Sequence, residues 1–206
     1  MKARELRRTA WNKLDKSWFT VVVGQIVQAI TAAMLLPTIV GPLVIGGVFS
    51  FGMATMLLRC HWNGKADLND LFSGFRFCLG NSIVARLTIW GRTLLWSLLL
   101  LIPGIVKAHS YAMTFHILAQ DPKLEVSEAI RRSEYMMNGK KWSLFCLNCS
   151  FIGWFLLIPL SLGIAGWWVI PYYEAARTEL FCALQEQMTR DGYYTEKEAG
   201  TLREPL

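Results

Sequence analysis

Six ionisable side chains lie within or beside long apolar stretches of this 206-residue chain, where charge is costly. They are Arg86, Arg92, Lys107, Glu174, Arg177 and Glu179, and the first four are the candidates for charges inside a membrane. A charge at the centre of a bilayer costs about 2.5–3.5 kcal/mol on insertion scales, so such residues usually pair or line a polar pathway. Arg92 is predicted to lie deepest, with Glu174 as its buried partner. Arg177 and Thr178, at i+3 and i+4 from Glu174, offer a local alternative.

These charges allow two interpretations. They could line a pathway for an anion or a lipid headgroup. They could instead form one structural ion pair, with the remaining side chains reaching to the membrane surface. We favour the structural pair.

A second set of side chains could ligate a soft metal. His109, Met113 and His116 are spaced at i, i+4 and i+7 and would share one helix face, and Cys146 and Cys149 lie one turn apart. Imidazole, thioether and thiolate ligands suit such metals, but a metal site needs converging ligands with supporting contacts. Because these residue types also pack commonly in helix interfaces, we predict no metal and no cofactor.

The motifs of common enzyme classes are absent from the sequence. It has no P-loop, no Gly-x-Ser-x-Gly elbow, no His-Glu-x-x-His and no dinucleotide-binding Gly-x-Gly-x-x-Gly. The polar stretches, about twenty residues each, are too short to fold a catalytic domain. The sequence therefore predicts a protein that is not an enzyme and has no catalytic residues.

The elements that must position these side chains follow from the distribution of charge. Almost all of the 21 Lys and Arg residues lie in four polar stretches, which are 1–16, 59–76, 120–141 and 177–203. The breaks between apolar runs have none; they are Pro37–Pro42, Ile102–Gly104 and Pro159–Gly163. Short loops rich in Lys and Arg stay on the cytoplasmic side of a membrane. The alternation predicts a multi-pass protein with both termini cytoplasmic.

Six apolar runs are predicted to cross the membrane as three hairpins, since about 20 apolar residues span the hydrocarbon. They are Trp18–Leu36, Val40–Leu58, Ile83–Ile102, Ile105–Ala119, Trp142–Ile158 and Ile164–Leu184. The fourth run is short. Basic stretches flank the third and fourth runs together, which requires an even number of crossings between them and makes Pro103-Gly104 an outer turn. One kinked helix over 83–119 is the alternative, and Pro171 should kink the last helix.

Two basic stretches resemble each other and are predicted to form short amphipathic cytoplasmic helices. Leu6–Trp11 and Ile130–Tyr135 each carry an aliphatic residue, two arginines, a hydroxyl residue and an aromatic at matching offsets. Such helices suit the headgroup plane of a membrane. The predicted contacts with the anionic inner leaflet are Arg7, Arg8, Arg131 and Arg132. The match indicates either a pseudo-repeated membrane domain or the general enrichment of Arg, Lys and Trp where a chain enters the membrane.

Small residues follow one face of the second run. Gly46, Ser50 and Ala54 have the spacing that lets two helix backbones approach closely, and we interpret them as a helix-packing face rather than a pore lining. The fold class is then all-α, a polytopic transmembrane helical bundle of about six helices. A single integral membrane domain covers 1–185, and a polar cytoplasmic C-terminal tail covers 186–206.

Composition agrees with a membrane protein. The chain is 53% hydrophobic, whereas an ordinary soluble domain has about 45–50% apolar residues. Nine Trp and six Tyr suit the two membrane–water interfaces. The net charge is +6, but no basic motif in the sequence belongs to a known nucleic-acid-binding fold. We therefore expect anionic lipid rather than nucleic acid as the partner.

Several blocks of residues, taken together, resemble one known family. They are Met1–Leu6, Asp70–Phe75, Ile102–Ala108, Ser150–Trp154 and Ile170–Tyr172. In these blocks the chain resembles the bacterial integral membrane proteins of domain-of-unknown-function family 975. The resemblance implies a polytopic protein of the bacterial cytoplasmic membrane. It implies no activity and no catalytic residues.

Two function classes follow. The favoured one is a non-enzymatic protein acting through lipids, a membrane-protein partner or a second copy of itself. The rival is a small transporter or channel for an anionic or lipid-like solute. The interior should discriminate between them: a continuous polar cavity reaching Arg92 favours transport, and a dry core packed with Gly and Ala favours the first class.

Overall fold

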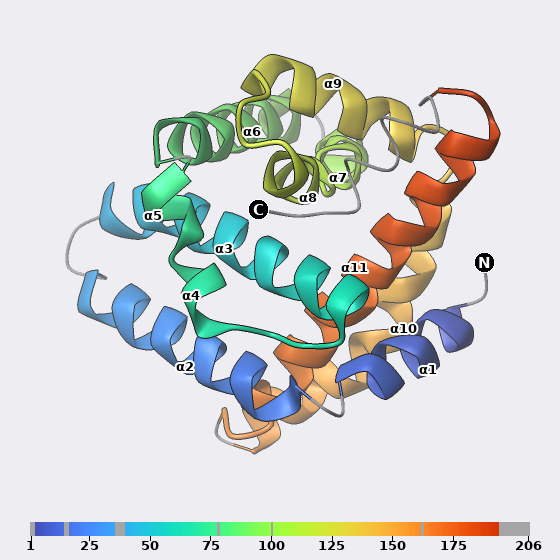
Figure 1. Ribbon diagram of the computed structural model, residues 1–206. Coiled ribbons are helices and arrows are strands. Elements are labelled where there is room, and N and C mark those ends of the chain that lie inside the picture. The colour runs from blue at the N-terminus through green and yellow to red at the C-terminus, as the bar shows by residue number, and fades with distance from the viewer. Residues whose placement is uncertain are drawn as a thin grey trace.

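The computed structural model is built of helices throughout the residues that it describes, which are 3–14, 17–35, 40–77, 79–99, 101–161 and 163–193 (Figure 1). In chain order the helices are α1 (Ala3–Leu14), α2 (Trp18–Leu35), α3 (Val40–Asn63), α4 (Leu68–Leu71), α5 (Ser73–Phe77), α6 (Leu79–Leu99), α7 (Leu101–Ser110), α8 (Thr114–Gln120), α9 (Val126–Met137), α10 (Lys141–Leu160) and α11 (Gly166–Arg190). The all-α prediction is confirmed.

Helix α3 is the central element of the molecule. It packs against α2, α6, α8 and α11, and every residue from Phe51 to Leu58 is buried. A helix that is apolar all round must be covered on every side. Figure 1 shows α2 beside α3, the helices α6 to α9 together on one side, and α11 crossing on another with α1 and α10.

Five of the six predicted apolar runs correspond to long helices, namely α2, α3, α6, α10 and α11. Among the described helices, α10 alone is both long and apolar enough to cross a membrane on length and composition, and Trp18–Thr31 is a shorter apolar segment. The predicted turn after α10 is present: Gly163 has φ +91° and donates its N–H to the Ile158 carbonyl at 2.8 Å. The break at Pro37–Pro42 falls partly outside the described residues.

The fourth predicted span is wrong. Its residues form α7, with 10 residues, and α8, with 7, separated by a turn at Tyr111–Met113. At 1.5 Å per residue they are roughly 15 and 10 Å long, against about 30 Å of hydrocarbon. The Ser133 hydroxyl on α9 stabilises the break, because it accepts the Met113 N–H at 3.2 Å and donates to the Ser110 carbonyl at 2.8 Å.

The predicted outer turn at Pro103-Gly104 is also wrong. Both residues lie inside α7, with Pro103 at its third position. Proline is tolerated in the first turn of a helix because the N–H groups there have no intrahelical acceptor. The single kinked helix over 83–119 is not formed either, since α6 and α7 are separate helices packed on each other.

Two contacts contradict the six-span threading. Lys107, assigned to the outer side, forms an ion pair with Glu134 of a basic stretch assigned to the cytoplasm, with Nζ and Oε1 2.8 Å apart. The rings of Trp18 and Trp168, assigned to opposite ends of their spans, have centroids 4.4 Å apart. Groups on opposite sides of about 30 Å of hydrocarbon could not meet in this way. The alternation of charge therefore does not determine the threading.

The two amphipathic helices are present as α1 and α9, but their apolar faces are covered by the protein. Leu6, Ala10 and Leu14 are buried where α1 packs on α11. The corresponding face of α9 packs on α8, and its predicted apolar residues Val126, Ile130 and Met137 are all buried. The expectation that these faces dip into the headgroup plane is therefore corrected, because the bundle already buries them.

The boundary of the predicted C-terminal tail lies inside a helix. Helix α11 passes through the buried Pro171 and continues to Arg190, five residues beyond 185. Residues 194–206 lie outside the described part of the chain.

Candidate functional site

A polar cavity of about 440 Å³ lies where α2, α3, α6, α7, α8, α10 and α11 meet. Its polar lining residues are Gln25, Gln28, Ser50, Arg86, His109, Tyr111, His116, Asn148, Tyr173, Glu174 and Arg177. The centre of the molecule is therefore not a dry core packed with small residues. Arg86 and Glu174, two of the predicted charge candidates, line this one cavity.

The small residues of α3 do not serve as predicted. Ser50 and Ala54 line the cavity, and a side chain at Gly46 would point to the guanidinium of Arg86, 3.7 Å away. The tight backbone approaches of α3 lie on a different face, at Gly47 and Gly52. Two of the three residues interpreted as a helix-packing face, Ser50 and Ala54, thus belong to the wall of the cavity.

Arg86 brings a positive charge into the cavity without a carboxylate beside it. Its side chain is half-buried, and no hydrogen bond or ion pair within the described parts of the chain involves it. Helix α6 carries it to the cavity because α6 packs closely on α3, where a Cβ on Gly47 would lie 2.5 Å from the Ser82 carbonyl oxygen. A partly desolvated guanidinium can form charge-assisted hydrogen bonds with an anion.

Arg177 lies across the same cavity and is held by its neighbours. Its Nη2 donates to the Ala112 carbonyl, and its Nη1 is 3.6 Å from Oε1 of Glu174. Its Nε is buried and has no partner among the described residues. The ion pair of Glu174 is thus the local one, three residues along α11.

The predicted pair between Arg92 and Glu174 is not formed. Arg92 is exposed and is not among the described residues that line the cavity. It follows Arg86 by six residues, which at about 100° per residue places it roughly 240° around the helix. Arg86 and Arg92 therefore point in different directions from α6, and only Arg86 reaches the interior.

The charges in the cavity favour an anionic ligand. The two guanidinium groups, Arg86 and Arg177, are close enough to repel each other, and Glu174 is the only carboxylate among the described lining residues. Repulsion between like charges strengthens as water is excluded. One anionic group placed between Arg86 and Arg177 would relieve it.

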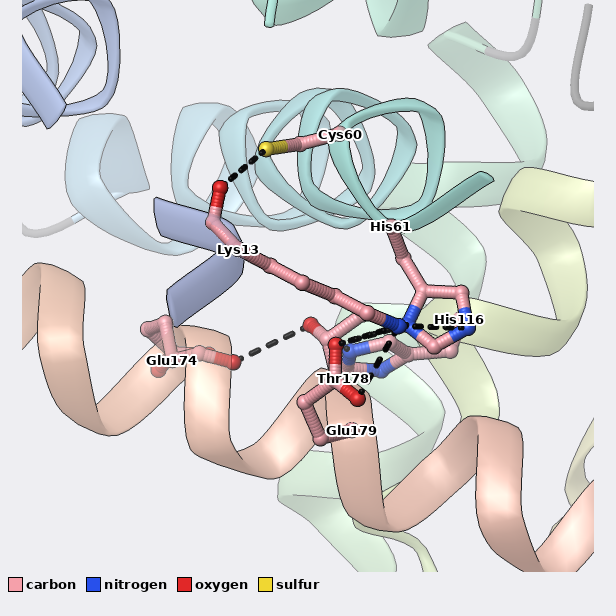
Figure 2. A network of polar contacts seen from close by, with 7 residues as sticks. All are labelled: Lys13, Cys60, His61, His116, Glu174, Thr178 and Glu179. Carbon is pink, nitrogen blue, oxygen red and sulfur yellow. Dashed lines mark hydrogen bonds and ion pairs between the residues drawn. The ribbon is translucent and has the colours of Figure 1, made fainter. Parts of the chain in front are cut away.

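The wall of the cavity contains a buried histidine, His116, one ring nitrogen of which has no hydrogen-bond partner in the described structure (Figure 2). His116 is 3% exposed; its Nε2 is 3.1 Å from the Thr178 hydroxyl, which donates to the Glu174 carbonyl at 3.0 Å. The other ring nitrogen, Nδ1, has no partner in the described structure. Buried polar groups are nearly always hydrogen-bonded, so this nitrogen is available to a ligand or a water molecule.

The residues considered as soft-metal ligands do not share one helix face, because the turn at Tyr111–Met113 interrupts the helix between them. His109 contacts the Ile105 carbonyl at 2.8 Å through Nδ1 and Asn148 at 3.2 Å through Nε2. Cys149 is exposed. Within the described ranges, no group of three or more His, Cys, Asp or Glu side chains has an arrangement that could hold a metal ion.

A second polar cluster, which sequence reasoning missed, joins three helices (Figure 2). Nδ1 of His61 on α3 lies 2.6 Å from Oε1 of Glu179 on α11, and Nζ of Lys13 on α1 lies 3.4 Å from the same oxygen. Thr178, next to Glu179, connects this cluster to His116 in the cavity wall. The three side chains, Lys13, His61 and Glu179, are far apart in sequence, and no spacing rule relates them.

The arginines predicted to contact the inner leaflet fall into two different environments. Arg131 and Arg132 both pair with Glu128, at 2.8 and 3.0 Å. Arg7 instead donates to the Ser150 hydroxyl at 2.8 Å, and Arg8 is exposed. The two similar sequence segments are thus electrostatically different, since Glu128 of α9 pairs with both arginines, whereas Glu5 of α1 forms no ion pair within the described residues.

Glu128 should make the stability of α9 depend on pH. The hydrogen bonds from Arg131 and then from Arg132 lower the pKa of Glu128 below its ordinary value of 4.5. The contribution of Glu128 to the stability of the folded protein is therefore fully present above about pH 4.5 and is lost as the pH falls through the lower pKa of the folded state. We expect Glu128→Gln to cost about 0.5 kcal/mol at neutral pH, as for exposed helical ion pairs. Thermal melting in detergent between pH 7 and pH 3 measures this, and an unchanged acid-side loss of stability in the variant would contradict it.

Comparison with known proteins gives one match. The family model described as "Protein of unknown function (DUF975)" matches residues 79–187, from the start of α6 almost to the end of α11. No curated protein matches the chain, and neither does any solved structure.

The matched range contains three of the five blocks in which the sequence resembles the family, those at 102–108, 150–154 and 170–172. It also contains Arg86, Glu174 and Arg177 of the cavity. Since the match covers more than half of the 206 residues, the chain belongs to this family of proteins of unknown function, DUF975.

Proposed function

We propose that this protein is a non-enzymatic integral protein of the bacterial cytoplasmic membrane that binds a small anionic solute in the central cavity and transfers it across the bilayer. The observation that carries the proposal is Arg86, a half-buried cation that lines a polar cavity and has no carboxylate partner within the described structure. Burying a charge is costly unless it is paired, so the position of Arg86 calls for an anion.

Membrane insertion is supported by the apolar side chains on the surface. Helix α10 has the length and composition of a span. Large apolar residues are exposed along α6 and along α10 to the start of α11; they are Val84, Leu87, Trp90, Leu94, Leu95, Phe145, Ile152, Trp154, Leu156, Leu157, Leu160, Ile164, Trp167 and Trp168. Soluble monomers rarely expose apolar areas of this extent, whereas a bilayer covers them at no cost.

The composition of the cavity supports transfer of a solute rather than an architectural role. Side chains from seven helices line the cavity. Among its described lining residues, two arginines face one glutamate, so their net charge is positive. Intramembrane ionisable residues that face a water-filled cavity commonly mark solute pathways. The cavity reaches Arg86 and not Arg92, so the pathway would follow the inner face of α6.

The polar groups of the cavity support binding without chemistry. Ser50, a possible nucleophile there, donates its hydroxyl to the Gly46 carbonyl of its own helix at 2.7 Å. His109 contacts a backbone carbonyl and an amide. A nucleophile needs an adjacent base for activation, and these contacts pair neither group in that way.

Reconstitution into liposomes tests the proposal. We expect proteoliposomes to take up chloride or inorganic phosphate from a tracer pool well above the rate of protein-free liposomes, and to exclude potassium. Uptake that does not exceed the protein-free rate for both anions, or a preference for potassium, would overturn the proposal. Both probes are small enough for a cavity of about 440 Å³.

A further inference from the structure

A basic groove lies between α1 and α11, separate from the central cavity. It has a volume of about 410 Å³ and is lined by Arg4, Arg7, Arg8, Trp11 and Tyr172. The four α1 residues are spaced at i, i+3, i+4 and i+7, which places them on one side of the helix. The groove therefore presents three guanidinium groups and an indole together.

These arginines are not neutralised by a neighbour. Within the described residues, no ion pair involves Arg4, Arg7 or Arg8. Arg7 is held in place by donating to the Ser150 hydroxyl at 2.8 Å and to the Tyr172 hydroxyl at 3.4 Å. A guanidinium that is already fixed loses little side-chain entropy when a ligand binds.

We propose that this groove binds the phosphate group of an acidic membrane phospholipid. Guanidinium groups match the geometry of phosphate oxygens and form two parallel hydrogen bonds with them. Arg4 lies in the first turn of α1, where the helix dipole also favours negative charge. The rings of Trp11, Trp18 and Trp168 cluster beside the groove, as aromatic side chains do at a membrane–water interface.

The surface next to the groove suits acyl chains and so favours a lipid over a free phosphate. Ser150, which holds Arg7, is followed on the same side of α10 by Trp154 and Leu157, at i+4 and i+7. Their side chains are 39% and 44% exposed. An apolar stripe thus leads away from the basic groove, and a phosphate bound there would place its acyl chains along that stripe.

The similar segment on α9 provides a matched control. Arg131 and Arg132 occupy the positions that Arg7 and Arg8 occupy on α1, but Glu128 pairs with both of them. A role in lipid binding that depends on unpaired arginines should therefore belong to α1 and not to α9. General attraction of basic residues to an anionic surface would involve both segments equally.

Native mass spectrometry of the detergent-purified protein tests the proposal, with phosphatidylglycerol and phosphatidylcholine as probes. We expect the wild-type protein to retain phosphatidylglycerol at least about 10-fold better than phosphatidylcholine, and R4Q/R8Q to lose that preference, since hydrogen bonds between charged partners are the strong ones. R131Q/R132Q should keep it. Arg4 and Arg8 are exposed, so their replacement leaves the packing of α1 intact.

Three results would overturn the proposal. They are equal retention of the two lipids by the wild-type protein, equal loss of selectivity in both double variants, and displacement of the lipid by millimolar inorganic phosphate, which would mark a site for a soluble anion. The proposal depends on membrane location but not on transport. Loss of anion uptake with lipid selectivity intact would remove only the transport function, because Arg86 and Arg4 line different sites.

Discussion

Replacing Arg86 by glutamine is expected to weaken binding of chloride or phosphate by about 10- to 100-fold and to reduce uptake into proteoliposomes accordingly. A hydrogen bond to a charged group contributes about 1.5–3 kcal/mol, and every 1.4 kcal/mol is tenfold in affinity. Arg86 is the cavity cation without a partner in the described structure, so its charge is the one that an entering anion meets. Isothermal titration calorimetry and tracer uptake measure the two effects.

Arg92→Gln is the matched control for this prediction. It makes the same chemical change on the same helix, but Arg92 is exposed and lies outside the described lining of the cavity. We expect its binding and uptake to stay within about twofold of wild type, since exposed charges contribute little. Loss of uptake in Arg92→Gln together with normal uptake in Arg86→Gln would place the pathway outside the cavity.

Replacing Gly52 by alanine is expected to destabilise the fold by about 3 kcal/mol, the upper part of the range for overpacking a filled interior. A Cβ at Gly52 would lie 2.6 Å from the carbonyl carbon of Leu71 and closer still to its oxygen. Both atoms belong to the backbone of α4, so no side chain can rotate away. The shift of the melting temperature in detergent measures the loss.

Gly91→Ala is the control for that substitution. Gly91 lies within α6, and a Cβ there would meet nothing within 4 Å. Alanine in an open helical position is expected to raise stability by up to about 1 kcal/mol, because glycine has the lower helix propensity. If Gly52→Ala had the same melting temperature as Gly91→Ala, α3 and α4 would not approach as closely as the structure places them.

The helices were predictable because their signals are local. Apolar runs of sufficient length predict α2, α3, α6, α10 and α11, and apolar spacing at i, i+3, i+4 predicts the covered faces of α1 and α9. Pro103-Gly104 was misleading, since the same dipeptide suits an outer turn or the first turn of a helix. The break after α7 was not predictable either, because Ser133 of α9 pairs the open backbone groups at Ser110 and Met113, which is a tertiary contact.

The cavity was only partly predictable. Its charges stand out because Arg86 and Glu174 interrupt apolar runs, and charge within such runs is costly. Their partners were not predictable, because hydropathy does not report which side of a helix faces the interior. The rotation of α6 about its own axis directs Arg86 into the cavity and leaves Arg92 exposed. Glu174 therefore forms its ion pair with Arg177 rather than with Arg92.

By itself the sequence determined that this protein is a set of apolar helices with a few costly charges among them, because hydrophobic periodicity and charge act over one or two helical turns. The tertiary structure alone decided which charges meet and which helices are long enough to span. It brought Lys107 to Glu134 and joined Lys13, His61 and Glu179 from three helices. These are contacts between distant segments, formed when packing around α3 sets the rotation and order of the helices, and no local pattern records them.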